Sequence, residues 1–146
     1  MPAIPRQQAY LAVYVLLWRD GRILALQRQN TGYMDGLWCP PAGGVDLGES
    51  VAQCAVRECA EEVGVSIDPD SLTLLHTMHR LTPERYVIDL FFQADFTGQP
   101  LNAEPHKAAA IEWVDPSGDW PWMTYIPQAF QHMQNDSAFS QFGFTQ

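Results

Sequence analysis

The sequence predicts an α/β protein in which helices cover the faces of a mixed β-sheet. Two observations lead to this prediction. Strand-like segments come first, and a helix-like segment, further strand-like segments and a second helix-like segment follow, an order typical of helices packed on a sheet. Hydrophobic residues make up 47% of the chain, which includes five tryptophans, so a buried core is expected. With 146 residues, the chain is predicted to be a single domain, 1–146.

The first two strands are predicted to form a hairpin. Tyr10 to Trp18 is rich in aromatic and aliphatic residues, as expected of a strand. Arg19-Asp20-Gly21 is a hairpin-turn signal, and Arg22 to Arg28 returns with alternating side chains. The segments that follow are expected to be a loop (29–36), a brief strand (37–39) and an extended proline pair (40–41) that enters a glycine-rich loop (42–48).

A helix is predicted from Val51 to Val63. Ser50 and Gln53 form a capping-box pattern at its start, and Gly64 suits a left-handed cap at its end. Apolar residues recur at helical spacing between these caps and predict one buried face, which is made of Ala52, Ala55, Val56, Cys59 and Val63.

The rest of the chain is predicted to complete the sheet and to add a second helix. Pro127 is tolerated because it falls in the first turn of that helix. The expected elements are a turn (68–70), a strand (72–80), a turn (82–84), one long strand (86–96), a polar loop (98–106), a short strand (110–114), an irregular stretch (116–122), a helix (about 125–134) and an aromatic tail (139–144) that packs back on the body.

Charge and composition exclude several classes of partner. The net charge is −9, with one lysine and seven arginines, so the surface is expected to repel a nucleic-acid polymer. The apolar run 9–18 is too short to span a bilayer, and the first residues lack a secretory-signal pattern, so no membrane contact is expected. The three cysteines, Cys39, Cys54 and Cys59, have no disulfide-framework or zinc spacing, which favours reduced, buried thiols in a cytoplasmic protein.

Three glutamates crowd one flank of the predicted helix. Glu58, Glu61 and Glu62 stand at positions i, i+3 and i+4, where like charges destabilise a helix by a few tenths of a kcal/mol per pair, roughly. Such a cluster is explained if a hard divalent cation lies against it, because Mg²⁺ prefers oxygen ligands and bridges carboxylates to phosphates. The alternative is an acidic face that contacts only water.

The spacing of these residues favours the metal-binding alternative. Gly43, five residues, Glu49, seven residues and then Arg57-Glu58-Cys59-x-Glu61-Glu62-x-Gly64-Val65 resembles the box motif (43–65) of the Nudix hydrolase (MutT-like) family. The one departure is Cys59, where the family usually has a larger aliphatic residue. The resemblance implies an α/β/α sandwich with a mixed sheet. It also implies Mg²⁺-dependent hydrolysis, with Mn²⁺ as a substitute, of a phosphoanhydride bond in a nucleoside diphosphate linked to another moiety.

The resemblance assigns metal ligands position by position. Glu58 and Glu62 lie one helical turn apart and are the expected principal ligands, and Glu61 is a third ligand or the base that activates water. The main-chain carbonyl of Ala42 matches a backbone ligand of the family. Glu49 is an occasional ligand, although it also suits the positive N-terminus of the helix.

Further residues are candidates for catalysis or substrate binding. Arg57 is expected to orient a carboxylate, Glu49 or Glu61, more than to act on substrate. Glu104 is a candidate extra ligand or general base, because a glutamate in this downstream loop serves so in several Nudix enzymes. The candidates for substrate binding are Arg28 for a phosphate, Gly43 and Gly44 for close approach of the backbone, and Trp38, with Tyr33, for stacking on a base or ribose.

Two alternative functions remain open at this point. A Nudix-fold module without catalysis could bind a nucleotide and regulate a partner, but loss of a box glutamate would be its signature, and none is lost. An isomerase of prenyl diphosphates on the same fold is weaker still, since no cysteine lies where a proton donor can be argued. The substrate is left open between nucleoside triphosphates, nucleotide sugars and ADP-ribose, and the resemblance leaves a homodimer open too.

Overall fold

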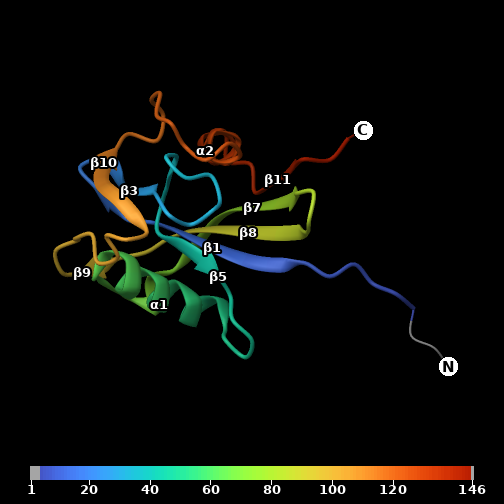
Figure 1. Ribbon diagram of the computed structural model, residues 1–146, viewed down its shortest axis with the longest axis horizontal. Helices are drawn as coiled ribbons and strands as arrows, with labels where there is room; N and C mark the ends of the chain where they lie inside the picture. Colours follow the sequence, from blue (N-terminus) through green and yellow to red (C-terminus); the bar gives the residue numbers. More distant parts are fainter. Residues whose placement is uncertain (1–3, 146) are drawn as a thin grey trace.

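A mixed sheet of five strands forms the centre of the molecule (Figure 1). The structure is a computed structural model and describes residues 4–145. Strand order is β11-β7-β8-β1-β5, with β1 parallel to β8 and β7 parallel to β11, while the β1–β5 and β7–β8 pairs are antiparallel. The strands span Tyr10–Leu16 (β1), Ala42–Gly44 (β5), Thr73–Leu81 (β7), Tyr86–Gln93 (β8) and Phe139–Phe142 (β11).

A smaller antiparallel sheet is built around β3, which pairs with β2, β4 and β10. It begins with the expected hairpin, since Asp20 and Gly21 both have positive φ in the turn between β2 and β3. The remaining elements are β2 (Trp18–Arg19), β3 (Arg22–Arg28), β4 (Trp38–Cys39), β6 (Ser66–Ile67), β9 (Phe96–Thr97), β10 (Ala108–Val114), the helices α1 (Val51–Val63) and α2 (Ile126–Gln134), and a 3₁₀ turn (Pro69–Ser71).

The two helices cover opposite faces of the sheet, because the side chains of β1 alternate between two cores. Val13 and Val15 belong to the core that contains the buried face of α1. Tyr14 and Leu16 belong to the other core, together with the buried residues of α2. In Figure 1, α1 accordingly lies on one side of β1 and α2 on the other. This is the α/β/α arrangement that the sequence predicts.

Helix α1 begins and ends at the predicted residues. Both hydrogen bonds of the capping box between Ser50 and Gln53 are present, and Gly64 adopts the left-handed conformation with φ 69°. The buried face includes Cys54, which the periodicity did not single out, because the helix also packs its first turn against β5. All three cysteines are buried and unpaired, as expected.

The structure corrects the predicted strands at four places. The expected strand 10–18 is two strands, because β1 ends at Leu16 in the mixed sheet and β2 begins at Trp18, where it pairs with β3 in the smaller sheet. At the other three places, pairing with a distant segment decides the boundary. The expected strand 86–96 is two strands, since the chain leaves the mixed sheet after Gln93 and β9 pairs with the unexpected β6. The expected strand 110–114 begins at Ala108, across a bulge in its pairing with β3. Residues 42–44 are a strand along β1 and not a loop.

The C-terminal segment packs back on the body, as predicted, and does so as strand β11. His76 of β7 holds this segment through both ring nitrogens: Nδ1 lies 2.8 Å from the Ser137 carbonyl oxygen and Nε2 lies 2.7 Å from Ser140 Oγ. Within residues 4–145, no helix reaches the length and apolarity that crossing a membrane would require.

Candidate active site

The candidate site is built where α1 runs along the free edge of β5. In the pairing of β5 with β1, Gly43 faces Val13, so the main-chain groups of its neighbours Ala42 and Gly44 point away from β1 and towards α1. The Ala42 N–H donates to Glu62 Oε2 at 2.9 Å, and the Gly44 carbonyl accepts from Arg57 Nη2 at 3.2 Å. Backbone and carboxylate are therefore brought together at this edge, with the Ala42 carbonyl on the same side.

Gly43 is required here by space and not by backbone conformation. A Cβ at Gly43 would overlap the carboxyl group of Glu58, whereas a Cβ at Gly44 would meet nothing within 4 Å. Neither glycine has a positive φ; in this segment only Gly48 does. We expected Gly43 to permit close approach of the backbone to a metal or substrate. In the structure, the group that lies close to the Gly43 backbone is the Glu58 side chain of α1.

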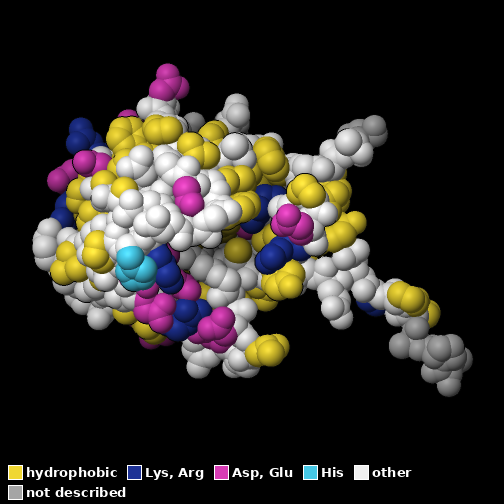
Figure 2. Space-filling model, viewed as in Figure 1, with side chains coloured by type: hydrophobic (Ala, Val, Ile, Leu, Met, Phe, Trp, Pro, Cys, Tyr) yellow, Lys and Arg dark blue, Asp and Glu magenta, His cyan; other side chains and the backbone are white. Residues whose placement is uncertain are grey.

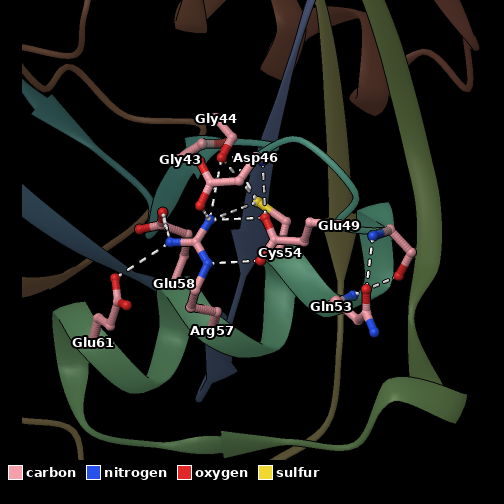
Figure 3. A network of polar contacts seen from close by, with 10 residues as sticks. Gly43, Gly44, Asp46, Glu49, Gln53, Cys54, Arg57, Glu58 and Glu61 are labelled. Atoms are coloured by element: carbon pink, nitrogen blue, oxygen red, sulfur yellow. Dashed lines mark hydrogen bonds and ion pairs between the residues drawn. The ribbon is translucent and has the colours of Figure 1, made fainter.

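Arg57 is the centre of the polar network on α1 (Figure 3). Its Nε and Nη2 donate to the two carboxylate oxygens of Glu49 at 2.7 and 2.9 Å, the bidentate contact that the sequence suggested. Nη1 donates to Glu58 at 2.7 Å and to Glu61 at 3.4 Å. One guanidinium therefore fixes three of the five predicted metal-site residues relative to one another, and Figure 2 shows acidic and basic side chains gathered over α1.

The carboxylates of this network differ in their electrostatic surroundings. The hydrogen bonds from Arg57, and then the Asp46 N–H, lower the pKa of Glu49 to about 2, so Glu49 is ionised. Burial raises the pKa of Glu58, against the opposing effect of Arg57. Burial also raises the pKa of Glu62 well above its usual value, and the charge of Glu58 raises it further. Both carboxylates would be stabilised by a nearby cation.

A cavity of about 540 Å³ opens beside these carboxylates. Four glutamates line it, Glu58, Glu61, Glu62 and Glu104, although Glu104 comes from the loop before β10, far from α1 in the sequence. The structure thus brings the downstream candidate to the box residues. The charge of Glu104 contributes to the raised pKa values of Glu58 and Glu62. Its own side chain lies 3.8 Å from Lys107 Nζ.

The donor set fits a hard divalent ion in its chemistry, although the side chains do not converge. Among residues 4–145, no three His, Cys, Asp or Glu side chains are arranged so that they could hold a metal ion. The reason lies in their present partners, since Glu58 accepts from Arg57 and Glu62 from the Ala42 N–H. Carboxylate oxygens beside a cavity are nevertheless the kind of ligand that Mg²⁺ or Mn²⁺ prefers, and a bound cation would offset the burial that raises the pKa of Glu58 and Glu62.

A second cavity, of about 560 Å³, lies on the other side of β5. All three residues of β5 line it, together with residues of β1, of the β7–β8 turn and of the segment that enters α2. Arg28 lines both cavities, so the two spaces meet at this residue. Arg28 Nε and Nη2 donate to the Tyr33 carbonyl and to Thr31 Oγ1, which holds the guanidinium at that position. The predicted phosphate-binding arginine therefore lies at the junction.

Trp38 does not lie where a substrate contact would require. The side chain of Trp38 is 7% exposed, packs edge-on against Trp120 at 5.1 Å and lines neither cavity. Pairing of β4 with β3 turns this residue into the core, so the prediction that it stacks on a base or ribose is wrong. Tyr33, its suggested companion, does line the second cavity and is 41% exposed.

A buried polar network at the floor of the second cavity was not predicted. Arg80 of β7 makes a bidentate ion pair with Asp89 of β8, at 2.6 and 3.0 Å. Tyr14 donates to the same carboxylate at 2.8 Å, and Tyr125 lies 2.6 Å from the Tyr14 hydroxyl. The sequence did carry a signal, because Arg80 and Asp89 are charged residues inside two apolar strands. Such residues are rarely buried unless they are paired.

Comparison with known proteins agrees with this fold. The family model of the NUDIX domain matches residues 9–118. The ADP-ribose pyrophosphatase of Methanocaldococcus jannaschii is 32% identical over 93 residues, which are 64% of this chain and 54% of that protein. The 8-oxo-dGTP diphosphatase of Proteus vulgaris is 30% identical over 87 residues, 60% of this chain and 76% of that protein.

A solved structure shows the same architecture over most of the chain. The crystal structure of a MutT NUDIX hydrolase from Burkholderia pseudomallei superposes with a TM-score of 0.76 at 26% identity, covering 86% of this chain and 98% of that one. The predicted α/β/α sandwich with a mixed sheet is thereby confirmed. The chain spans about half the length of two of the curated relatives that it matches, 54% and 45%.

Proposed function

The chain belongs to the NUDIX family, and on that premise we propose that it is a Mg²⁺-dependent hydrolase of a small nucleotide. The bond cleaved is a phosphoanhydride in a nucleoside diphosphate linked to another moiety. Two relatives support this class, since one is named for ADP-ribose and the other for 8-oxo-dGTP, both of which contain such a bond. We propose that the protein acts in the cytoplasm, in line with its three free thiols.

One observation carries the proposal: Glu58 and Glu62 lie half-buried against the backbone of β5, with raised pKa values and an open cavity before them. A carboxylate held this way is costly unless a cation or a proton compensates it. Within the described residues, Glu62 makes no ion pair, and it accepts a hydrogen bond from the Ala42 N–H. A structural role would have placed an arginine against it, as Arg57 is placed against Glu49.

The residues that would hold the ion are Glu58 and Glu62, with Glu61, Glu49 and the Ala42 carbonyl as the further oxygen donors proposed. A divalent ion bound there would neutralise phosphate charge and lower the pKa of a coordinated water. Arg57 is the proposed positioning residue, because its guanidinium contacts Glu49, Glu58 and Glu61 and so orients three of the proposed ligands.

The proposed reaction adds water to a phosphorus atom and breaks the bond to the bridging oxygen, which leaves with the second product. Glu61 and Glu104 are the proposed acceptors of the water proton, since both line the cavity. Arg28 is proposed to bind a phosphate, because it lies at the junction of the two cavities. Gly43 and Gly44 leave room for the substrate along β5, as the second cavity is lined by their backbone.

The test is a panel of nucleotides incubated with Mg²⁺ or Mn²⁺, with product masses used to locate the bond cut. The panel contains nucleoside triphosphates, nucleotide sugars and ADP-ribose. Glu58→Gln and Glu62→Gln are each expected to lower turnover by at least about 100-fold while the thermal unfolding midpoint changes little. Glu112→Gln, an exposed glutamate of β10 outside both cavities, is the matched control and should remain fully active.

Three results would count against the proposal. Unchanged turnover in both glutamate variants would show that Glu58 and Glu62 are not part of the active site. Turnover that is unaffected by chelation of divalent ions would show that hydrolysis does not depend on a metal. Tight nucleotide binding with no hydrolysis of any member of the panel would favour the regulatory binding module instead.

A further inference from the structure

The floor of the second cavity is a hydrogen-bond chain whose direction can be assigned. Tyr14 has a single hydroxyl hydrogen and donates it to Asp89, so in the 2.6 Å contact between the two tyrosines it is Tyr125 that donates to Tyr14. Burial raises the pKa of both phenols, which keeps them protonated. Arg80 donates to the same carboxylate from the other side. Asp89 thereby accepts three hydrogen bonds, and its bidentate contact fixes the plane of the Arg80 guanidinium.

Arg80 has donors that the protein leaves unused. A guanidinium carries five N–H groups, and Asp89 takes the edge formed by Nε and Nη2. Nη1 donates to the Tyr33 hydroxyl at 3.0 Å. One N–H on each terminal nitrogen then has no partner among residues 4–145. The side chain is only 8% exposed and lines the cavity, so these buried donors face a space that a ligand could fill.

The lining of this cavity suits an aromatic ligand rich in hydrogen-bond acceptors. Three arginines line it, Arg28, Arg80 and Arg85, against one acidic side chain, Glu84, in a protein of net charge −9. The Arg80 guanidinium lies 3.9 Å from the ring centre of Tyr125, and Tyr33 adds a second ring at the wall. Aromatic and guanidinium planes are surfaces on which a nucleobase stacks.

We propose that Arg80 is a specificity-determining residue that selects a 6-oxopurine base of the guanine type. This inference rests on the proposed function, because the base belongs to the nucleotide whose phosphates lie beside α1. The Nη1–Nη2 edge donates two parallel hydrogen bonds to O6 and N7 of the base, the commonest bidentate pairing of arginine with a base.

Other bases do not match this edge. Adenine presents an amino group beside N7, so one N–H of Arg80 would face another N–H. Uracil and thymine present one acceptor, O4, beside a carbon. Discrimination by a bidentate pair corresponds to about 5- to 150-fold in affinity. We therefore expect a preference of at least about fivefold for GMP over AMP.

The experiment measures binding of nucleoside monophosphates to the full chain by calorimetry, without added metal. GMP and IMP are expected to bind alike, since both carry O6 and N7. AMP and 7-deaza-GMP, which lacks the N7 acceptor, are expected to bind at least about fivefold more weakly. Equal binding of the four ligands, tighter binding of AMP, or no binding of GMP at millimolar concentration would each overturn the inference.

A variant separates selection of the base from stability of the fold. Arg80→Lys keeps a positive charge beside Asp89 but removes the planar fork, so the GMP-to-AMP affinity ratio should fall to near one. Arg85→Lys is the matched control, because Arg85 lines the same cavity, is exposed and contacts the Tyr10 ring; its ratio should stay as in the parent. Thermal unfolding of both variants is followed alongside. A parent-like ratio in Arg80→Lys overturns the assignment even if that variant is less stable.

The result can be distinguished from the outcome of the hydrolysis test. A preference for GMP without hydrolysis of any nucleotide would keep the base subsite and reject the proposed enzyme. Hydrolysis of nucleotides with no preference among bases would keep the enzyme and reject the subsite.

Discussion

Gly43→Ala is the substitution that most directly tests how β5 and α1 form the candidate site. A Cβ at Gly43 would overlap the carboxyl group of Glu58. The φ angle of Gly43 is not positive, so alanine can adopt this backbone conformation without strain. The Glu58 side chain therefore has to move to make room for the new methyl group, whereas the backbone at position 43 can keep its conformation.

Two effects on the free energy of unfolding oppose each other in this variant. Alanine is favoured over glycine within a strand by about 0.5–1 kcal/mol. Moving Glu58 breaks its 2.7 Å contact with Arg57. The side chain of Glu58 is 15% exposed and that of Arg57 is 28% exposed, and such an ion pair contributes at most about 1 kcal/mol to stability. The two effects nearly cancel, so stability should change by less than about 1 kcal/mol.

Activity has no such compensation. A displacement of about 1 Å in a catalytic group can lower the rate on the order of 100-fold, which corresponds to about 2.7 kcal/mol of transition-state stabilisation. We expect kcat/KM to fall by about that factor, measured with the best substrate of the nucleotide panel. Gly44→Ala is the control, because its Cβ would meet nothing within 4 Å, and it should stay active. Full activity in Gly43→Ala, or equal losses in both variants, would refute this reasoning.

Three further predictions concern stability. Gly143→Ala should destabilise the protein by about 1–3 kcal/mol in urea unfolding, because Gly143 has φ 88° and a Cβ would overlap the Leu81 carbonyl oxygen. Glu49→Gln should make unfolding depend less on acid pH. The pKa of Glu49 is about 2 in the folded protein and about 4.3 in the unfolded chain. Glu49 therefore stabilises the fold above about pH 4.3, and this contribution is lost as the pH falls towards 2. His76→Gln should make the unfolding midpoint depend less on pH below about pH 6.5. Burial lowers the pKa of His76 in the folded protein, so the unfolded chain binds the proton more readily and the stability of the parent decreases as the pH falls.

Each of these predictions has an outcome that contradicts it. An unchanged urea midpoint in Gly143→Ala would mean that β11 contributes little to global stability. Parallel acid-unfolding curves for the parent and Glu49→Gln would show that the Arg57 contact does not hold in solution. If the parent and His76→Gln lost stability equally between pH 7 and 5, His76 would not be the source of the pH dependence.

The parts of the site that the sequence predicted are those that local chemistry determines. Helix α1 has its caps and its glutamates within one stretch of chain, so its boundaries, its acidic flank and part of its buried face could be predicted before the fold was known. The exceptions are Cys54, which is buried although it was not predicted to be, and Ala52 and Val56, which are only half-buried. Glu49 lies just before the N-cap of α1 and Arg57 lies within the helix, eight residues later, so their contact also forms within one stretch of chain. Glu104 was reached through the family resemblance alone, since no local pattern connects its loop to α1.

The parts that the sequence did not predict depend on strand register. Asp89 pairs with Met78 and Arg80 with Val87, so the Arg80–Asp89 ion pair forms diagonally across two strands and exists only in this register. Trp38 has the composition of a stacking residue, but its pairing with Gln27 of β3 sets its side chain against Trp120 in the core. Periodicity gives the face on which a residue lies and not the element that covers that face.

Strand β5 links the two halves of the site, and this arrangement leads to a last prediction. The strand consists of Ala42, Gly43 and Gly44, so almost no side chain separates the carboxylates of α1 from the second cavity. A nucleotide with its base on Arg80 and its phosphates beside Glu62 would run along this backbone. Gly43→Ala should then slow hydrolysis and leave the GMP-to-AMP affinity ratio unchanged, whereas Arg80→Lys should remove the ratio and leave the metal dependence of hydrolysis unchanged. If Gly43→Ala also changed the affinity ratio, or if Arg80→Lys also changed the metal dependence, the two cavities would be one coupled site. The proposal that separate residues along β5 control hydrolysis and base selection would then be wrong.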